Sequence, residues 1–199
     1  MTENLILASG SFIRRQMLEK AGLKFQTEVA KVDEDSLKVS LIAEDASPRD
    51  IADTLAEMKA LRVSGRHPGT LVIGSDQVLE FNGEILNKPA SISQARGQLS
   101  TLRGSSHKLL SAVVICRDGQ PIWRHVGVAR MSMRNFSDQY LDDYLSRNGD
   151  SCLTSVGGYK LEEEGVRLFE KIEGDYFTIL GMPLIELLNY LTTTKEIQA

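Results

Sequence analysis

The sequence predicts an α/β fold in which helices flank a mixed β-sheet. Short apolar runs typical of strands alternate with the apolar spacing of helices, and turn residues separate most of them. The chain has 199 residues, an apolar share of 42% and a charged share of 25%, which are values of an ordinary globular protein. We expect one domain over residues 1–199, divided into two interleaved lobes with a cleft between them.

The N-terminal segment predicts a strand, a polar turn and a helix. The apolar run Leu5–Ala8 is typical of a short buried strand, and Ser9–Ser11 forms the turn. From Phe12 the apolar spacing becomes helical, and Gly22 ends the helix.

A second helix begins with a capping pattern. Ser47 takes the N-cap position, Pro48 the first helical position, and Asp50 completes a capping box. Apolar residues then recur on one side of the helix, which we expect to run to about Val63: Ile51, Leu55 and Met58.

The middle of the chain is rich in strands. Residues 70–73 form a β-rich apolar run that continues through 78–81 to Asn82-Gly83, a strong signal for a two-residue hairpin. Segments 109–115 and 122–133 are expected to pair around a turn at residues 118–119.

Three further helices are expected. Their starts are marked by residues with capping or turn chemistry: Ser91, Ser137 and Pro183. The first of them ends near Leu102, the second runs through Leu145, and the third carries leucines on one side.

The charge balance argues against one class of partner and permits another. Lys and Arg number 23 against 27 Asp and Glu, which gives a net charge of −4 and argues against nucleic-acid binding by broad phosphate neutralisation. A small anionic ligand needs only a few cations gathered in one pocket, so it remains allowed. We therefore expect a small-molecule partner and no nucleic acid.

The cysteines and the apolar segments indicate a reduced, cytoplasmic setting without membrane association. Cys116 and Cys152 form no Cys-x-x-Cys pair, so we expect buried small side chains and not a zinc or redox site. The N-terminal apolar run is too short for a signal sequence, and no stretch approaches membrane-spanning length.

The turn at residues 9–15 has the features of an anion site. Ser9 stands at the strand-to-helix turn, and Arg14 and Arg15 occupy the first helical turn. Unpaired N–H groups and the positive end of the helix dipole favour anions there, and an arginine can donate two hydrogen bonds to one phosphate. An ordinary helix cap with surface arginines is the alternative interpretation of this segment alone.

Two further positions could join such a site. Asp76 follows the apolar strand at the end where open α/β sheets tend to place ligands, and its carboxylate could hold a divalent cation or take a proton from water. Lys88 follows the hairpin and could reach phosphate oxygens. Taken alone, an aspartate after a strand is more often a turn former, and Lys88 would be a solvated lysine.

Lys59 and the acidic cluster Asp33–Asp35 are also open to two interpretations. Lys59 stands beside an apolar helix face, where long lysines usually reach water. Three adjacent carboxylates usually form a solvated turn, although Mg²⁺ bound beside phosphate would recruit such groups.

In this order the motifs resemble the Maf family of nucleoside triphosphate pyrophosphatases. The resemblance covers nearly the whole chain. Five segments carry it in family order: LILASGSFIRRQMLEKAG, Val32-Asp33-Glu34, MKA at 58–60, IGSDQV with GEILNKP, and GGYKLEEEGVRLFEKIEGDYFTILGMPL.

The resemblance implies a fold like that of inosine triphosphate pyrophosphatases, with a curved mixed sheet, flanking helices, and two lobes around a central cleft. It implies hydrolysis of a nucleoside triphosphate between the α and β phosphates, with Mg²⁺ or Mn²⁺. Asp76 matches the family's catalytic base, and Glu34 matches an acidic position near the metal, which Asp76 could share. The phosphate-binding positions are matched by Ser9, Arg14, Lys59 and Lys88.

Three positions match those where the family selects its base: Ile13, Gln77 and Glu162. The branch acting on dTTP and UTP usually has Arg, Thr and Gln there, and the branch acting on 7-methyl-GTP has Trp, Gln and Glu. Gln77 and Glu162 fit the second branch, whose substrate would be a modified nucleotide to be removed, and a carboxylate suits the donors of a guanine edge. Ile13 lacks the aromatic face for a cationic base, although Phe12 could compensate, so a broader specificity stays open.

Two other functions remain alternatives. A nucleotide-binding regulator of cell division, which the resemblance also suggests, would bind nucleotide with negligible turnover. A phosphomonoesterase would release the terminal phosphate as orthophosphate. A homodimer is compatible with the resemblance and with the apolar C-terminal helix, although that helix could instead pack on the sheet.

Overall fold

A single hydrogen-bonded sheet runs through the chain, which divides into two compact units. The computed structural model describes residues 4–198. Within them, the first unit contains the residues up to Gln77, Leu110–Gly127 and the residues from Tyr176 onward. The second unit contains Val78–Leu109 and Val128–Asp175.

The sheet is mixed, as predicted. Its strand order is β2-β1-β3-β5-β6-β7, with β4 paired to β3. The strand β1 (Leu5–Leu7) pairs in parallel with β2 (Gln26–Thr27) and with β3 (Leu71–Phe81). In contrast, β3 pairs antiparallel with β4 (Glu84–Leu86) across the predicted Asn82-Gly83 turn.

The long strands β5 (Ser106–Arg117) and β6 (Gln120–Met133) are those predicted around the turn at residues 118–119. No residue range was predicted for the strand β7 (Phe169–Glu173). Its sequence FEKIE has three charged residues in five, and antiparallel pairing with β6 accounts for its extended form. Pairing with a strand distant in sequence leaves no local signal.

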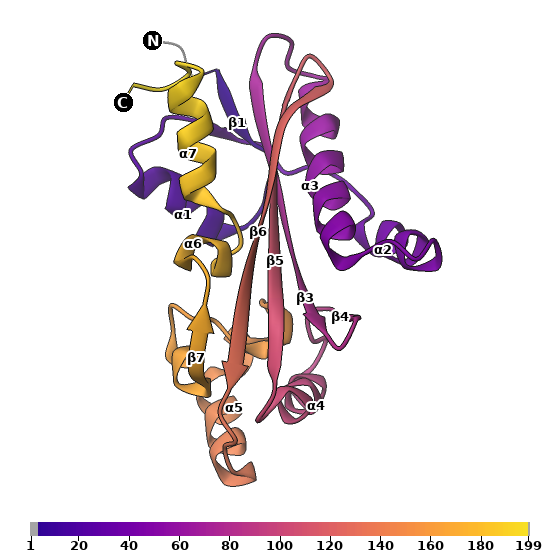
Figure 1. The fold of residues 1–199 in the computed structure, drawn as a ribbon, viewed down its shortest axis with the longest axis vertical. Coiled ribbons are helices and arrows are strands. Elements are labelled where there is room, and N and C mark those ends of the chain that lie inside the picture. Colours follow the sequence, from indigo (N-terminus) through magenta and orange to yellow (C-terminus); the bar gives the residue numbers. More distant parts are fainter. Residues whose placement is uncertain (1–3, 199) are drawn as a thin grey trace. The chain divides into compact units, whose positions relative to one another are not determined.

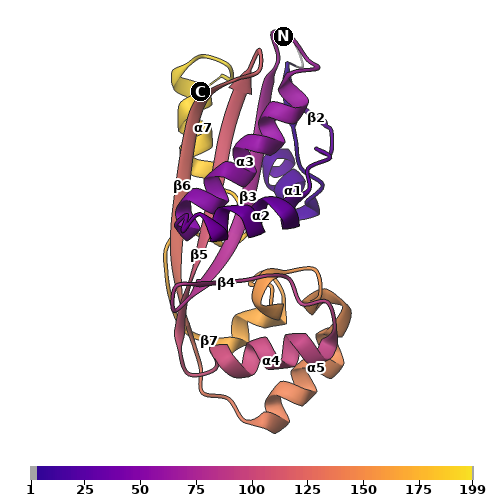
Figure 2. The same ribbon diagram turned by 90° about the vertical axis from the view of Figure 1, so that its right-hand side faces the viewer.

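In the first unit, helices cover both faces of the sheet. Figures 1 and 2 show α1 (Phe12–Lys20) and α7 (Leu184–Thr193) on one face, and α3 (Pro48–Ser64) with α2 (Glu34–Ala43) on the other. Alternate residues of β1 join the buried apolar cluster under α1 and α7. Its members from strands and helices include the following: Leu5, Leu7, Met17, Leu18, Ile73, Leu184, Leu187 and Leu191.

The leucines of α7 therefore pack inside their own chain. The alternative that this helix packs on the sheet is confirmed by its place in the buried cluster. The apolar face of α7 therefore no longer supports the predicted homodimer. The homodimer stays a prediction.

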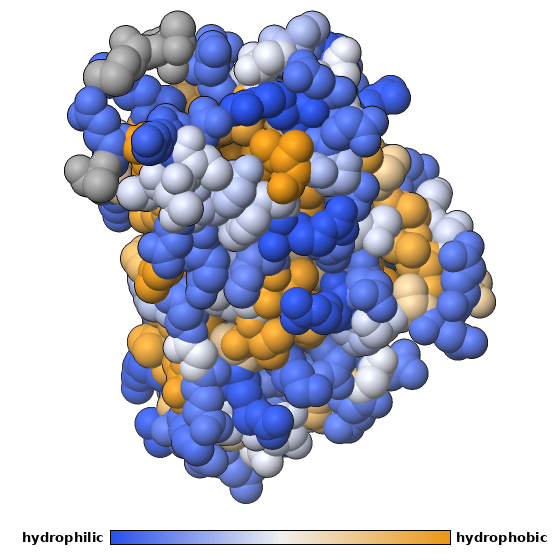
Figure 3. Space-filling view, turned by 45° about the horizontal axis from the view of Figure 1, so that its top comes forward, coloured by the Kyte–Doolittle hydropathy of each residue, from blue (hydrophilic) through white to orange (hydrophobic). Residues whose placement is uncertain are grey.

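The helix α2 was not predicted. Asp33 is its N-cap and accepts a hydrogen bond from the backbone N of Ser36 at 3.1 Å. The helix has no buried residue, so it lacks the apolar stripe that sequence patterns detect. Two of its apolar side chains are instead exposed, Val39 at 68% and Ile42 at 52%, and Figure 3 shows apolar surface over this helix.

The second unit packs α4 (Ile92–Leu102) against α5 (Asp138–Cys152) and the short helix η1 (Val156–Gly158). A further short helix, η2 (Glu164–Leu168), leads into β7. The caps Ser91 and Ser137 are confirmed.

The helix α5 runs past the predicted end at Leu145 to Cys152. Most of its residues after Leu145 are polar, and they include Gly149. A Cβ on Gly149 would lie 3.0 Å from the side chain of Ile92, so α4 packs directly on this part of α5. Tertiary packing therefore overrides the local sequence signal.

Cys116 and Cys152 are free and buried, as predicted. Among the helices of residues 4–198, none is long and apolar enough to cross a membrane.

Candidate active site

The guanidinium of Arg14 is buried at the start of α1, with the residue only 9% exposed. Its Nη1 donates to the backbone oxygen of Ser75 at 2.9 Å and lies 3.4 Å from Oγ of Ser9. Ser11 caps the helix by accepting a hydrogen bond from the backbone N of Arg14. The alternative interpretation as a surface arginine is therefore wrong for Arg14.

The turn after α6 (Tyr176–Ile179) holds the other side of this guanidinium. The backbone oxygen of Gly181 accepts from Nε of Arg14 at 2.8 Å and from Oγ of Ser75 at 3.0 Å. Gly181 has a φ of 109°, and a Cβ there would lie 3.4 Å from Nε of Arg14. The backbone conformation therefore favours glycine, and an added Cβ would be in van der Waals contact with the arginine.

The surroundings of Arg14 favour an anion. No acidic residue occupies the first turn of α1, so its N-terminal dipole is not compensated by a side chain of that turn. Burial lowers the pKa of Arg14, and the negative charges of Asp76 and Glu34 offset part of this effect. The hydrogen bonds found within the described residues engage Nε and Nη1, which leaves the two N–H groups of Nη2 for a ligand.

Lys59 joins two carboxylates in the same unit. Its Nζ lies 2.6 Å from Oδ1 of Asp76 and 2.9 Å from Oε2 of Glu34. The residue is 7% exposed, so the alternative interpretation as a lysine that reaches water is wrong. Burial of an ammonium group is tolerated here because both carboxylates neutralise it.

Gly74 allows α3 to approach β3 closely enough for this contact. A Cβ on Gly74 would lie 2.1 Å from the backbone oxygen of Ala56 and 2.7 Å from the backbone N of Ala60. Only a residue without a side chain fits under the helix at this point. Since Lys59 precedes Ala60 on α3 and Asp76 follows Gly74 on β3, this packing brings the two charged groups together.

Asp76 has one carboxylate oxygen that is still available. Its Oδ2 is buried and has no hydrogen-bond partner among the described residues. A buried, unpartnered carboxylate oxygen is costly unless a ligand, water or ion satisfies it. The atom is therefore suited either to accept a proton from water or to bind a cation.

The residues fit a divalent cation held jointly with a phosphorylated ligand. Lys59 shows that Glu34 and Asp76 lie close enough to contact one positive group, and Mg²⁺ typically uses one or two carboxylates plus substrate phosphates. Within residues 4–198, no group of three His, Cys, Asp or Glu side chains forms a metal site by itself. The carboxylate of Asp33 caps α2 by accepting hydrogen bonds from Ser36, and its part in a metal site stays a prediction.

The other predicted residues of the first unit lie in different settings. Arg15 is on the exposed side of α1, where it pairs with Glu19 at 3.4 Å and lies over the ring of Phe12. Ile13 is half-buried at the start of the same helix. Their predicted roles in phosphate and base binding stay predictions.

Gln77 follows Asp76 on β3, and its side-chain amide faces the turn after α6. Its Nε2 lies within 3.1 Å of three oxygen atoms, which belong to Ser111, Thr178 and Ile179. Sequence reasoning assigned no role to Ser75, Ser111 or this turn. Their contribution comes from backbone oxygens and small hydroxyls, which leave no motif in a sequence.

Lys88 and Glu162 belong to the second unit. Lys88 is exposed between β4 and α4, and Glu162 is exposed in the turn between η1 and η2. The structure brings Ser9, Arg14, Lys59 and Asp76 together in the first unit, and the roles of Lys88 and Glu162 stay predictions.

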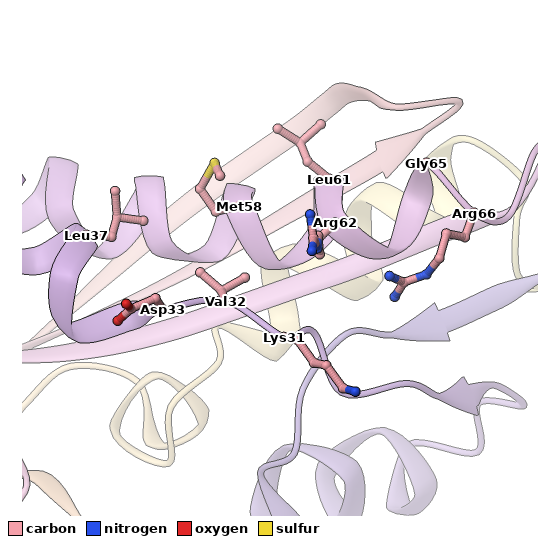
Figure 4. Close-up of a pocket in the computed structure, with 9 residues that line it drawn as sticks. All are labelled: Lys31, Val32, Asp33, Leu37, Met58, Leu61, Arg62, Gly65 and Arg66. Atoms are coloured by element: carbon pink, nitrogen blue, oxygen red, sulfur yellow. The ribbon is translucent and has the colours of Figure 1, made fainter.

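An open hollow of about 800 Å³ lies between α2, α3 and the segment before α2 (Figure 4). Basic side chains lie at one end of it: Lys31, Arg62 and Arg66. Asp33 and apolar side chains lie at the other: Leu37 and Met58. Within the described part of the chain, the hollow is not lined by Glu34 or Lys59. These two residues are adjacent in sequence to Asp33 and Met58, which do line it. We therefore place the candidate active site at the buried cluster of Arg14, Lys59, Glu34 and Asp76, and not in this hollow.

The fold and this cluster define an α/β protein with a buried arginine and lysine beside two carboxylates, a set suited to a phosphorylated ligand and a cation. The chain belongs to the family of Maf-like proteins, which matches residues 4–194.

Three relatives are similar over nearly the whole chain. A nucleoside triphosphate pyrophosphatase of Ruegeria pomeroyi is 59% identical over 191 residues, which are 96% of each chain. One of Roseobacter denitrificans is 58% identical over 197 residues, 99% of each chain. A 7-methyl-GTP pyrophosphatase of Mesorhizobium japonicum is 50% identical over 197 residues, 99% of each chain.

Proposed function

We propose that this chain hydrolyses a nucleoside triphosphate to the nucleoside monophosphate and pyrophosphate. The observation that carries the proposal is the buried cluster in which Lys59 contacts Asp76 at 2.6 Å and Glu34 at 2.9 Å, in the unit that also buries Arg14. Family membership and the names of the relatives support the same reaction.

The triphosphate is bound by the cations of the cluster. Nη2 of Arg14 donates two hydrogen bonds to phosphate oxygens, and the backbone N–H groups at the start of α1 add to this binding. Ser9, whose Oγ accepts from the backbone N of Ser11 at 3.2 Å, keeps its own hydroxyl proton for a phosphate oxygen. Lys59 turns from the carboxylates toward the entering phosphates.

The reaction is a displacement at the α-phosphorus. A water oxygen forms a bond to that phosphorus, and the bond from it to the oxygen bridging the α and β phosphates breaks. The proton of the attacking water passes to Oδ2 of Asp76, and pyrophosphate leaves with the electron pair of the broken bond. Arg14 and Lys59 stabilise the charge that develops on the leaving group.

A divalent cation, Mg²⁺ or Mn²⁺, would be held by Glu34 and Asp76 together with the substrate. When bound, it would supply charge neutralisation of the triphosphate and polarisation of the α-phosphate.

The base that we propose for the first test is 7-methylguanine. Gln77 and Glu162 match the pattern of that branch, and a relative 50% identical carries the name 7-methyl-GTP pyrophosphatase. Ile13 departs from the pattern, and the relatives at 58% and 59% carry a general name. A broad specificity, or a preference for dTTP and UTP, is therefore the second candidate.

Product analysis with Asp76→Asn tests the reaction. The substitution keeps an oxygen for Lys59 but removes the base, so we expect turnover to fall by roughly a hundredfold or more. The measurement is release of pyrophosphate from 7-methyl-GTP, GTP, UTP and dTTP with Mg²⁺ or Mn²⁺. The control is Asp53→Asn, which loses an ion pair with Arg124 and should keep nearly full activity.

Three outcomes would decide against the proposal. Full activity of Asp76→Asn would remove Asp76 from the reaction. Orthophosphate and diphosphate as products would favour a phosphomonoesterase. Tight nucleotide binding by the wild type without turnover would favour a nucleotide-binding regulator.

A further inference from the structure

Ser75 lies on β3 between Gly74 and Asp76, and its side chain is on the opposite face of the sheet from theirs. Neighbouring residues of a strand point to opposite faces. A Cβ on Gly74 would point at α3, and Asp76 contacts Lys59 of α3. Ser75 points the other way, is fully buried, and donates a hydrogen bond from its Oγ to the backbone oxygen of Gly181 at 3.0 Å.

Ser75 and Arg14 share this acceptor. Nε of Arg14 donates to the same oxygen of Gly181 at 2.8 Å, and Nη1 of Arg14 donates to the backbone oxygen of Ser75 at 2.9 Å. The three residues therefore form a closed ring of hydrogen bonds. Because a carbonyl oxygen can only accept, the hydroxyl proton of Ser75 lies on the bond to Gly181. Linked hydrogen bonds in a buried site strengthen one another.

The ring fixes the direction of the guanidinium. This group is planar and rigid, so the bonds at Nε and Nη1 determine where Nη2 points. The backbone oxygen of Ser75 also belongs to the peptide bond between Ser75 and Asp76. The ring therefore ties the arginine to the stretch of backbone that carries the proposed base.

We propose that Ser75 is a positioning residue, whose hydroxyl holds the turn at Gly181 and so orients the guanidinium of Arg14 toward the phosphates. The proposal rests on the proposed function, in which Nη2 of Arg14 binds phosphate. Without the hydroxyl, Gly181 keeps its bond to Arg14 but loses its side-chain bond to β3, so the turn and the guanidinium can shift together. Because Ser75 acts only through Arg14, its loss weakens phosphate binding whatever the base.

The experiment compares Ser75→Ala with the wild type. The first measurement is the Kd of inorganic tripolyphosphate, which has no base, by calorimetry in the presence of Mg²⁺. We expect Kd to rise by roughly fivefold to tenfold, the effect of one lost hydrogen bond. The second measurement is kcat/KM for GTP and UTP, which should fall by at least the same factor, because Arg14 also stabilises the leaving group.

Ser64→Ala is the matched control. Ser64 is a buried serine of the same unit, and its Oγ accepts from the backbone N of Gly119 at 3.1 Å at the end of α3. The substitution removes one buried hydroxyl without touching Arg14. It should therefore lower stability but leave the Kd of tripolyphosphate and kcat/KM unchanged.

An Arg14→Lys background separates positioning from general damage to the fold. Lysine has no guanidinium to orient, so adding Ser75→Ala in this background should change the Kd of tripolyphosphate by less than about twofold. A general loss of stability would act equally in both backgrounds. Ser75→Cys, which has a similar shape but is only a weak donor, should change Kd in the same direction as Ser75→Ala.

The proposal is overturned if Ser75→Ala leaves the Kd of tripolyphosphate unchanged, or if the wild type does not bind tripolyphosphate. It is also overturned if Kd rises by the same factor in Ser64→Ala or in the Arg14→Lys background. If Ser75→Ala does not fold, Ser75→Cys decides by the same measurements. If the wild type binds tripolyphosphate but hydrolyses no triphosphate, the proposed function fails, and the calorimetry still tests the role of Ser75.

Discussion

Among the site residues, Glu34 is the one whose substitution should act most specifically on metal binding. It stands at the start of α2 and contacts Nζ of Lys59 at 2.9 Å, while its side chain is 39% exposed. A carboxylate that is both near the cluster and open to solvent can exchange the lysine for a metal ion when substrate enters. We expect Glu34→Gln to raise the Mg²⁺ concentration for half-maximal activity by about tenfold.

Asp35→Asn is the matched control for this prediction. Asp35 is exposed and adjacent in sequence, so its loss removes the same charge from the helix start without touching Lys59. A Mg²⁺ titration of initial rates measures both variants. An equal shift in the two would mean that only the net charge of the segment matters.

Residue patterns suggested an anion site at the first turn and a ligand role for the aspartate after the strand, and the family resemblance added the helical lysine. The serine and arginine of the first turn, the post-strand aspartate and the helical lysine lie in one unit: Ser9, Arg14, Asp76 and Lys59. The groups that orient Arg14 were not predicted. Backbone oxygens of Ser75 and Gly181 accept its hydrogen bonds, and every residue has such an oxygen, so only the folded chain shows which ones are used.

At the scale of the elements, the site depends on close packing of α3 on β3. Gly74→Ala would place a methyl group against the backbone of the helix at Ala56. We expect a loss of stability of about 1–3 kcal/mol, as for overpacked cores, and a loss of activity of up to about a hundredfold as Lys59 shifts from Asp76. Urea unfolding and initial rates measure the two effects.

Gly97→Ala is the contrasting substitution. Gly97 lies inside α4, and no heavy atom would lie within 4 Å of the added Cβ. Alanine should stabilise the helix by up to about 1 kcal/mol and leave activity unchanged. If both variants lost stability equally, close packing at Gly74 would not explain the effect.

The elements that sequence patterns detected are those with a local signal. The helix α3 has a capping serine, a first-turn proline and a buried face, and both hairpin turns place their central residues at positive φ. The helix α2 has no buried face, and β7 depends on pairing with β6. Their stabilising contacts are distant in sequence or absent, which explains why α2 was not predicted and β7 had no predicted bounds.

At the scale of the whole molecule, His107 should make stability depend on pH. Burial lowers the pKa of His107 to about 4, although the charge of Glu80 raises it in part. Its Nε2 lies 2.6 Å from the hydroxyl of Tyr159, and its Nδ1 is buried without a hydrogen-bond partner among the described residues. A proton on Nδ1 would therefore be unsatisfied in the folded state.

The sign of this effect follows from the two pKa values. Unfolded histidine titrates near 6.5 and the folded residue near 4, so between these values the unfolded chain binds more protons and stability falls as pH falls. We expect a contribution of about 2 kcal/mol to the loss between pH 7 and pH 5. Urea unfolding at pH 7 and at pH 5 measures the loss of stability, which should be smaller by about 2 kcal/mol in His107→Gln than in the wild type. An equal loss in the two proteins would mean that His107 is not the titrating group.

The mixed sheet with helices on its faces was predictable because composition, caps and hairpin turns agree along the chain. The division into two units follows from which segments pack together. Three strands contribute residues to both units: β3, β5 and β6. The boundaries at Gln77, Leu110 and Gly127 therefore fall inside continuous strands, where no change in composition marks them.

We propose that the cluster around Arg14, Lys59 and Asp76 directs water to the α-phosphorus of a nucleoside triphosphate. Hydrolysis in ¹⁸O-labelled water, followed by mass spectrometry of both products, tests it most directly. We expect label in the nucleoside monophosphate, unlabelled pyrophosphate, and loss of both products with Asp76→Asn. Label in pyrophosphate, or orthophosphate with nucleoside diphosphate as the products, would contradict it.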